Sequence, residues 1–316
     1  MNVLSVFDGH STGYLALLRA GIKIDNYFSS EIATDPIKIS EKHFPDIIRL
    51  GDVTRVKAKD LPKIDLLIGG SPCQGFSRAG KCLNFEDPRS KLFFEFVRLL
   101  NEIREINPDA KFLLENVKMK NEWSRVISDA LGVEPIEINS KIVSPQNRLR
   151  MYWTNIPVKD FDIIDPPLCS ILEEVDTTGF IEKDGLLFDP IYSEASRNLV
   201  SVIDGEIRVK QSVKKGYIVA NDGDGVNLSF PTSKSRRGRV IDQKSSCLDC
   251  GCNCGVLHNG VIRQFTITEL ERLQTLPDGY TEGVSLSSRK EMIGNGWTTD
   301  VITLFFRGLK DENIYL

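Results

Sequence analysis

Residues 3–13, VLSVFDGHSTG, join a short apolar run to a turn that contains Gly9 and Gly13. The run from Val3 to Phe7 has the length of a strand, and residues 15–20 have the apolar spacing of a helix. Glycine lets a backbone turn sharply and lets a ligand approach it closely. The stretch therefore predicts a strand, a tight turn and a helix, although a tight turn that binds no ligand explains the glycines equally well.

The same alternation continues through the N-terminal half of the chain. Helices are expected over 91–106 and 123–131, and Gly21 and Gly132 stand where helices end. Further strands are expected at residues 27–31, 47–50, 64–68, 112–115, 136–139 and 151–154. Short strands that alternate with helices are typical of an α/β fold, so we predict a doubly wound, Rossmann-like parallel sheet.

The pattern changes near residue 158. Between residues 158 and 263 Gly, Ser, Asp and Lys dominate, and short strands are indicated only at 207–209 and 217–220. Helical signals return with Thr268 and Glu271, which have the spacing of a capping box, and a last apolar helix covers 298–309. We therefore expect a larger domain of residues 1–157 plus 264–316 and a smaller, loop-rich, β-containing domain of residues 158–263.

Composition excludes several classes of protein. The chain has 316 residues, 41% hydrophobic and 27% charged, which excludes disordered, collagen-like and coiled-coil proteins. The net charge of -4 argues against a uniformly basic nucleic-acid coat. No apolar run approaches the length of a membrane span and no secretory signal is recognisable, so we expect a soluble, cytoplasmic protein without membrane association.

Acidic residues follow the second and third expected strands. Glu31 stands where α/β folds place an acid that accepts hydrogen bonds from ribose hydroxyls, and Asp52 follows the next strand. Because the carboxyl ends of parallel strands meet at one edge of the sheet, these acids and the Gly9 turn predict an adenosine-shaped pocket.

The fourth and fifth strands end in residues capable of chemistry. Cys73 lies in the small-residue turn GGSPCQGFS, residues 69–77, and a thiolate is a strong nucleophile. Glu115 ends the next strand, where a partly buried carboxyl group can act as an acid toward a ring nitrogen. A packed cysteine and a capping carboxylate are the structural alternatives. Arg148 and Arg150 precede a strand and fall on one face of it, with surface charge as the alternative.

The smaller domain carries a basic segment and a cysteine cluster. Residues 205–246 hold nine basic and four acidic side chains, a local net charge of +5 that fits either a solvated loop or a phosphate-binding surface. Cys247, Cys250, Cys252 and Cys254 are spaced poorly for a structural zinc site, so we predict free thiols and no metal.

In this order the segments resemble the motifs of the DNA (cytosine-5)-methyltransferase family, in its small phage and bacterial form. Phe7-Asp8-Gly9 with Gly13 is similar to the family's S-adenosyl-L-methionine loop, and Gly70-Ser71-Pro72-Cys73-Gln74 to its nucleophile motif. Glu115-Asn116-Val117 is similar to its acid motif, Gln146-x-Arg148-x-Arg150 to its arginine motif, and Gly294-Asn295-Gly296 to its last motif.

The resemblance implies transfer of a methyl group from S-adenosyl-L-methionine to carbon 5 of a cytosine that is flipped out of duplex DNA, through a covalent adduct with Cys73. It implies that Glu115 hydrogen-bonds the base, that Arg150 contacts the flipped base and helps to orient Glu115, and that Arg148 supports the site. The implied cofactor-binding residues are Phe7, Asp8, Gly9, Ser11, Gly13, Glu31, Asp52, Val53, Asn295 and Trp297.

The resemblance also makes residues 158–263 a target-recognition domain. Gln74, Ser77, Arg236, Arg237 and Arg239 are the candidate DNA contacts. Double-stranded DNA is the expected partner, a cognate restriction endonuclease is a candidate partner, and we expect a monomer. Two alternatives are a tRNA cytosine-5 methyltransferase and a catalytically silent DNA-binding homologue; the presence of Cys73, Glu115 and Arg150 disfavours the second.

Overall fold

The computed structural model describes residues 1–71, 92–158, 161 and 163–310. The chain forms two compact units. The first comprises residues 1–139, 149–162 and 299–316, and the second comprises residues 140–148 and 163–298.

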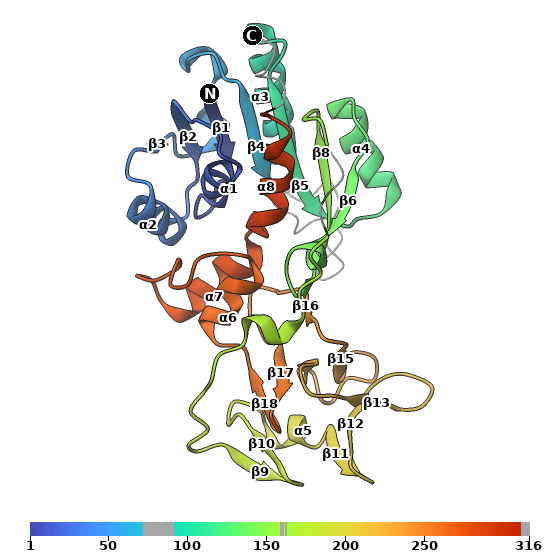
Figure 1. Ribbon diagram of the computed structural model, residues 1–316. Coiled ribbons are helices and arrows are strands. Elements are labelled where there is room, and N and C mark those ends of the chain that lie inside the picture. Colours follow the sequence, from blue (N-terminus) through green and yellow to red (C-terminus); the bar gives the residue numbers. More distant parts are fainter. Residues whose placement is uncertain (72–91, 159–160, 162, 311–316) are drawn as a thin grey trace. The chain divides into compact units, whose positions relative to one another are not determined.

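The first unit is built on a seven-stranded sheet with the order β3-β2-β1-β4-β5-β8-β6 (Figure 1). The first five strands in this order are parallel to their neighbours, whereas β8 runs antiparallel to both β5 and β6. The predicted α/β sheet is confirmed. The strands are β1 (Asn2–Val6), β2 (Asn26–Ser30), β3 (Ile48–Arg49), β4 (Leu66–Gly70), β5 (Lys111–Val117), β6 (Ile136–Asn139) and β8 (Leu149–Thr154).

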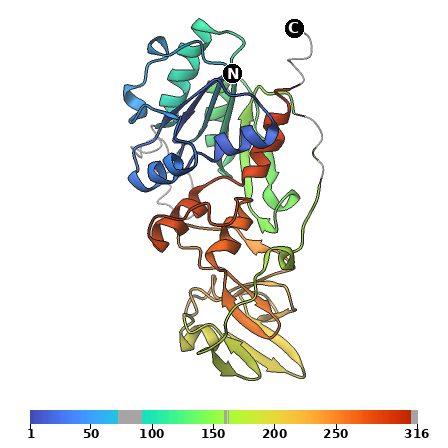
Figure 2. The same cartoon turned by 60° about the vertical axis from the view of Figure 1, so that its left-hand side comes forward.

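Helices cover both faces of this sheet, as the two views in Figures 1 and 2 show. Consecutive residues of β1, such as Val3 and Leu4, are both fully buried, which requires cover on each face. Leu4 belongs to a core cluster with apolar residues of α3 and α4, whereas α1 packs on α8, where Arg19 bonds Asp300. The helices are α1 (Thr12–Ala20), α2 (Thr34–His43), α3 (Leu92–Ile106), α4 (Asn121–Leu131) and α8 (Thr299–Arg307).

Two glycines end helices of this unit, as predicted. Gly21 follows α1 and Gly132 follows α4, both with the left-handed backbone that favours glycine after a helix. None of the helices in the described part of the chain is both long and apolar enough to cross a membrane.

The second unit contains three small sheets. A six-stranded sheet has the order β15-β14-β17-β18-β10-β9, a three-stranded meander joins β11, β12 and β13, and β16 pairs with β7. The strands are β7 (Gln146–Asn147), β9 (Ile181–Lys183), β10 (Leu186–Phe188), β11 (Val200–Ile203), β12 (Glu206–Lys210), β13 (Tyr217–Ala220), β14 (Gly225–Asn227), β15 (Arg239–Ile241), β16 (Ser245–Ser246), β17 (Gly255–His258) and β18 (Val261–Gln264). The helices are α5 (Glu194–Arg197), α6 (Ile267–Leu273) and α7 (Leu286–Asn295).

The two units divide the chain differently from the domain boundaries expected from the sequence. Residues 140–148 and 264–298, expected in the larger domain, group with the second unit. Buried bonds explain this grouping, since Ser144 Oγ and Gln146 Nε2 both donate to the carbonyl oxygen of Leu273, at 2.6 and 2.9 Å. Such long-range bonds cannot be recognised from helical periodicity, which is why the sequence predicts α6 and α7 in the larger domain with the other helices.

The capping box of α6 lies two residues before the predicted one. Thr266, not Thr268, caps the helix, and the backbone N–H of Thr266 bonds the side chain of Glu269. The pair Thr266 and Glu269 has the same spacing as Thr268 and Glu271. Both glutamates are fully buried, but their partners differ: Glu269 also forms a bidentate ion pair with Arg263, both bonds being 2.7 Å long, whereas Glu271 bonds the N–H groups of Gly279 and Thr281.

Candidate active site

The loop after β1 is organised around a buried carboxylate. Asp8 is 8% exposed and accepts hydrogen bonds from four hydroxyl groups, those of Ser5 (2.6 Å), Ser11 (2.5 Å), Tyr27 (2.8 Å) and Ser29 (2.7 Å). Burial raises the pKa of Asp8, and the four hydroxyl donors oppose that shift. Asp8 therefore shapes the loop from inside, and its side chain is directed to the protein rather than to a ligand.

The backbone of this loop is left-handed at three positions. The φ angles of Phe7, Gly9 and Ser11 are 57°, 57° and 59°. Such angles are unfavourable for Phe and Ser, and the bonds from Ser11 to Asp8 and from the Ser11 N–H to the Asp8 carbonyl oxygen (3.1 Å) hold them in place. Phe7 packs partly against the core, and Gly13 is buried in the first turn of α1.

Glu31 lies directly beside this loop, at the end of β2. Its Oε2 accepts a hydrogen bond from the Gly9 N–H at 2.9 Å, and its Oε1 accepts from the N–H groups of Ile32 and Ala33, both at 2.8 Å. A carboxylate oxygen can accept about two hydrogen bonds, and the described residues supply only one donor to Oε2 of Glu31. The carboxylate is thereby oriented and still able to accept a hydroxyl donor.

Asp52 caps the short 3-10 helix η1 (Val53–Arg55) after β3. Its Oδ1 accepts from both the N–H and the hydroxyl group of Thr54 at 2.9 Å. Both bonds lower the pKa of Asp52, and the backbone bond has the larger effect. No described residue donates to Oδ2, which leaves that oxygen for an amino-group donor. Val53 is buried in the core, so only its backbone faces such a ligand.

The nucleophile segment begins beside Asn116. The Asn116 side chain donates to Ser71 Oγ at 2.9 Å, and Gly70 pairs with Glu115 across β4 and β5. Gly69 allows close packing, because a Cβ there would lie 3.0 Å from the Val6 carbonyl oxygen. Cys73, Gln74 and Ser77 lie outside the described residues.

Glu115 and Arg150 form an ion pair. Arg150 Nε lies 3.0 Å from Glu115 Oε1, and both side chains are largely buried, with 12% and 11% exposed. The two residues come from the antiparallel strands β5 and β8, whose register is fixed by backbone pairing. A buried carboxylate held by a guanidinium group has a defined direction, which a group acting on a ring nitrogen requires.

Arg148 has different partners from Arg150. Its Nη1 donates to the Leu248 carbonyl oxygen at 3.2 Å and contacts Cys247 Sγ at 3.5 Å, while its Nη2 donates to the Gly296 carbonyl oxygen at 2.9 Å. The predicted shared strand face of the two arginines is therefore wrong: Arg148 lies between β7 and β8, not in the strand that carries Arg150. Arg148 is 3% exposed, and its hydrogen bonds link the backbone at Leu248 to the backbone at Gly296.

The last motif packs on the cysteine-rich loop. A Cβ at Gly294 would lie 2.2 Å from the Asp249 carbonyl oxygen, so only glycine fits there. Cys250 Sγ donates to Asn295 Oδ1 at 3.1 Å. Asn295 is exposed and Trp297 is half-buried.

The four clustered cysteines are free, and no group of three potential ligands among the described residues could hold a metal ion. Burial raises the pKa of Cys254 to about 11, and burial also raises that of Cys252. These two thiols are therefore protonated and packed. The cluster supports the last motif structurally.

Gln274 is a buried residue that sequence analysis did not single out. Its amide nitrogen donates to the carbonyl oxygens of Ile293 (2.7 Å) and Gly296 (3.2 Å). Its amide oxygen accepts from Gln146 (3.2 Å) and Thr298 (2.8 Å). It thus connects the arginine motif with the last motif within the second unit. Its neighbours Glu271, Arg272 and Thr275 are also polar, so nothing in the local sequence distinguishes Gln274.

The basic segment presents cations and one aromatic ring to solvent. Arg236 lies 4.6 Å above the ring of Phe230, which is 54% exposed, and Arg239 is exposed on β15. Arg237 is half-buried, and its Nε has no hydrogen-bond partner among the residues that the structure describes. Gly238 packs on β12, since a Cβ there would lie 2.2 Å from the Lys210 carbonyl oxygen. The turn at Gly238 is thereby fixed to the meander.

Comparisons with known proteins identify the family of this chain. The model of the family "C-5 cytosine-specific DNA methylase" matches residues 1–125 and 140–311. The chain is 32% identical to the type II methyltransferase M1.ScrFI of Lactococcus lactis subsp. cremoris over 292 residues, which are 86% of this chain and 69% of that protein. It is 31% identical to the type II methyltransferase M.HpaII of Haemophilus parainfluenzae, over 85% of this chain and 78% of that protein.

Solved structures show the same fold. The Entamoeba histolytica methyltransferase EhMeth is 17% identical and superposes with a TM-score of 0.66, covering 99% of this chain and 98% of that one.

Proposed function

This chain belongs to the C-5 cytosine-specific DNA methylase family and is a DNA cytosine-5 methyltransferase that uses S-adenosyl-L-methionine; from this premise we propose which of its residues perform each step. The observation that supports the assignment is the buried ion pair of Glu115 with Arg150, because its carboxyl group lies on β5 opposite Gly70, three residues before Cys73 in the sequence.

Glu115 and Cys73 divide the chemistry between them. Glu115 hydrogen-bonds ring nitrogen 3 and the amino group of the cytosine, which draws electrons from the ring. Cys73, as a thiolate, can then add to carbon 6 and make carbon 5 nucleophilic. After carbon 5 has gained the methyl group and lost its proton, the bond from carbon 6 to sulfur breaks and Cys73 leaves as a thiolate. Arg150 keeps Glu115 in the direction that this sequence requires.

The donor set at the edge of the sheet fits S-adenosyl-L-methionine. Glu31 would accept from its ribose hydroxyls through Oε2, and Asp52 would accept from its adenine amino group through Oδ2. The backbone of Phe7, Gly9 and Val53 would face the nucleoside, and we assign Asn295 and Trp297 to the same cofactor. When bound, the cofactor supplies an electrophilic methyl group on a sulfonium. Asp8 and Ser11 hold the loop that leads to Gly13, and Arg148 holds backbone of the second unit at Leu248 and Gly296.

The second unit would contact DNA through its basic segment. Arg236 and Arg239 are exposed cations that can bind phosphates or guanine edges, and we assign Arg237 to the same surface. Extrusion of the cytosine from the duplex costs about a few kcal/mol, which such contacts must offset. Gln74 and Ser77, next to Cys73, are proposed to contact the target strand.

We also assign two finer properties. A restriction endonuclease of the same specificity is the proposed partner, because the relatives are type II methyltransferases. The enzyme is proposed to act as a monomer. Protection of DNA methylated by this enzyme against a candidate endonuclease tests the proposed partner. Sedimentation with and without duplex DNA tests the monomeric state.

Transfer of labelled methyl groups tests the assignment. Unmethylated duplex DNA of mixed sequence and tRNA are incubated in parallel with the parent protein and with Cys73→Ala. We expect label in DNA as 5-methylcytosine, abolished by the substitution. Label in tRNA alone would mean that the enzyme performs the same chemistry on RNA. Activity retained by Cys73→Ala would exclude the covalent mechanism.

A further inference from the structure

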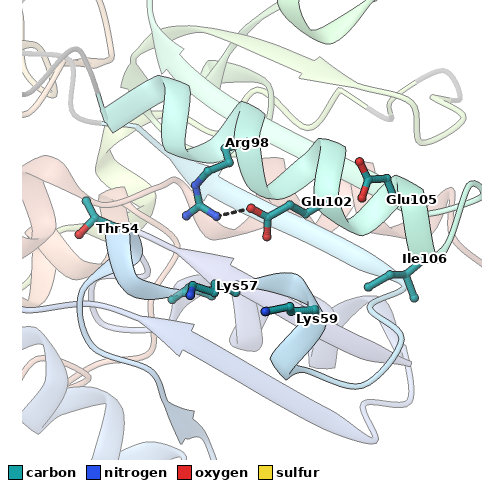
Figure 3. A pocket seen from close by; sticks show the side chains of 8 residues that line it. Thr54, Lys57, Lys59, Arg98, Glu102, Glu105 and Ile106 are labelled. Atoms are coloured by element: carbon teal, nitrogen blue, oxygen red, sulfur yellow. Dashed lines mark hydrogen bonds and ion pairs between the residues drawn. The ribbon is translucent and has the colours of Figure 1, made fainter.

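The segment that carries Asp52 packs against helix α3. It contains η1 and a second 3-10 helix, η2 (Ala58–Asp60), and a pocket of about 430 Å³ lies between this segment and the helix (Figure 3). Val53, Val56 and Ala58 are buried in the same core cluster as Leu99 and Ile103 of α3. Apolar contacts therefore keep the segment on the helix, but they do not orient its peptide groups.

The Val53 carbonyl oxygen accepts from the Val56 N–H at 3.2 Å inside the segment, and two charged residues of α3 add bonds from outside it. Arg98 Nη2 donates to the Val53 carbonyl oxygen at 3.2 Å, and Glu102 Oε2 accepts from the Ala58 N–H at 2.9 Å. Arg98 also bonds Glu102 at 2.6 Å, as Figure 3 shows, and Glu95 at 2.9 Å. The segment is thus held at two peptide groups, five residues apart, by side chains that are paired with each other.

The contact at Val53 reaches Asp52 through a single peptide group. The carbonyl oxygen of Val53 and the N–H of Thr54 belong to the same planar unit. Arg98 donates to its oxygen, while its N–H donates to Asp52 Oδ1 at 2.9 Å. Because the unit is rigid, fixing its oxygen also fixes the direction of its N–H. A charged donor at the oxygen polarises the group and strengthens the bond to Asp52.

We propose that Arg98 is a positioning residue for S-adenosyl-L-methionine binding, which orients the Asp52 carboxylate through the peptide between Val53 and Thr54, with Glu102 holding Arg98 and the far end of the segment. This inference rests on the proposed role of Asp52 toward the adenine amino group. Arg98 itself touches neither the cofactor nor the base.

Isothermal titration calorimetry tests the proposal by measuring the Kd for S-adenosylhomocysteine, which binds without turnover. Arg98→Ala should raise Kd about five- to tenfold. This is less than the full effect of losing one charge-assisted hydrogen bond to the ligand, because Arg98 acts through Asp52. Arg98→Lys should recover some affinity. Glu105→Gln is the matched control, because Glu105 lines the pocket on the same helix and bonds neither Arg98 nor the segment among the described residues; it should leave Kd nearly unchanged. The kcat at saturating cofactor should stay within about twofold in every variant.

A double-mutant cycle separates positioning from general stabilisation. If Arg98 acts through Asp52, Asp52→Ala and the double variant Asp52→Ala/Arg98→Ala should have the same Kd. Additive effects, or an unchanged Kd in Arg98→Ala, would overturn the proposal. If Asp52→Ala leaves Kd unchanged, the assignment of Asp52 to the cofactor fails instead. Thermal unfolding of each variant checks that it is folded.

Discussion

Arg150 Nε lies 3.0 Å from Glu115 Oε1, and the two residues belong to neighbouring antiparallel strands, β8 and β5. Pairing of the strand backbones fixes the Cα positions of both residues, and burial restricts the conformations of their side chains. The carboxyl group that we propose to act on the base is therefore held by the sheet itself, whereas a residue on a loop would need further support.

The first prediction concerns Glu115. Glu115→Gln removes the acid and its charge while keeping its shape, and it should lower kcat by about 10²- to 10⁴-fold, the usual contribution of a general acid or base. The Kd for S-adenosylhomocysteine should change little. Glu137→Gln on β6 is the control, because its carboxylate is partly exposed and pairs with Lys118. Single-turnover methylation measures the effect, and near-parent rates in Glu115→Gln would contradict the role.

The second prediction concerns the close approach at Gly294. Gly294→Ala places a methyl group 2.2 Å from the Asp249 carbonyl oxygen. Since backbone on both sides must move, the free energy of unfolding should fall by about 2 kcal/mol or more. Ser287→Ala, exposed on the same helix α7, should change it by less than about 0.5 kcal/mol. Urea unfolding compares the two, and equal stabilities would show that the loop adapts freely.

The third prediction concerns pH. Burial, with the positive charge of His43 as a smaller cause, lowers the pKa of His10 from 6.5 to about 4. The folded state thus binds fewer protons than the unfolded state between these values. The stability from the neutral imidazole is fully present above pH 6.5 and is lost as the pH falls toward about 4.

Urea unfolding of the parent and of His10→Asn at about pH 7 and about pH 4.5 isolates this contribution. The parent should lose about 2–3 kcal/mol more than the variant over that interval. Equal losses in the two proteins would mean that His10 is protonated without cost in the folded state.

The fourth prediction concerns the basic segment. Arg236→Ala and Arg239→Ala should weaken DNA binding, and each lost phosphate contact should reduce the slope of log K against log salt by about 0.9. Lys59→Ala removes an exposed cation of the first unit and should not change the slope. Fluorescence anisotropy at several salt concentrations measures this, and an unchanged slope in both arginine variants would place the phosphate contacts elsewhere.

The parts of this molecule that depend on local pattern could be predicted from sequence. The strand expected from Val3 to Phe7 and observed as Asn2–Val6, the glycine turn, and the caps at Gly21 and Gly132 all follow from neighbouring residues. Long-range bonds could not be predicted: nothing near Arg148 in the sequence indicates that it binds the carbonyl oxygens of Leu248 and Gly296.

Asp8 illustrates the same limit within the site. The motif associates it with the cofactor, but its four hydroxyl partners come from three successive parts of the chain, around Ser5, Ser11 and Tyr27 to Ser29. Only their folding together shows that the carboxylate is directed inward. The division of the chain at residues 140–148 and 264–298 depends in the same way on bonds to Leu273 and Gln274.

The central claim is that Cys73 attacks carbon 6 of a cytosine that Glu115 has polarised. The most direct test uses duplex DNA containing 5-fluorocytosine together with S-adenosyl-L-methionine, because fluorine cannot leave carbon 5 as a proton does, and the adduct therefore persists. Mass spectrometry of the digested complex should find the nucleotide on the Cys73 peptide, with none in Cys73→Ala and much less in Glu115→Gln. An adduct on another cysteine, or equal yields from parent and Glu115→Gln, would contradict the mechanism.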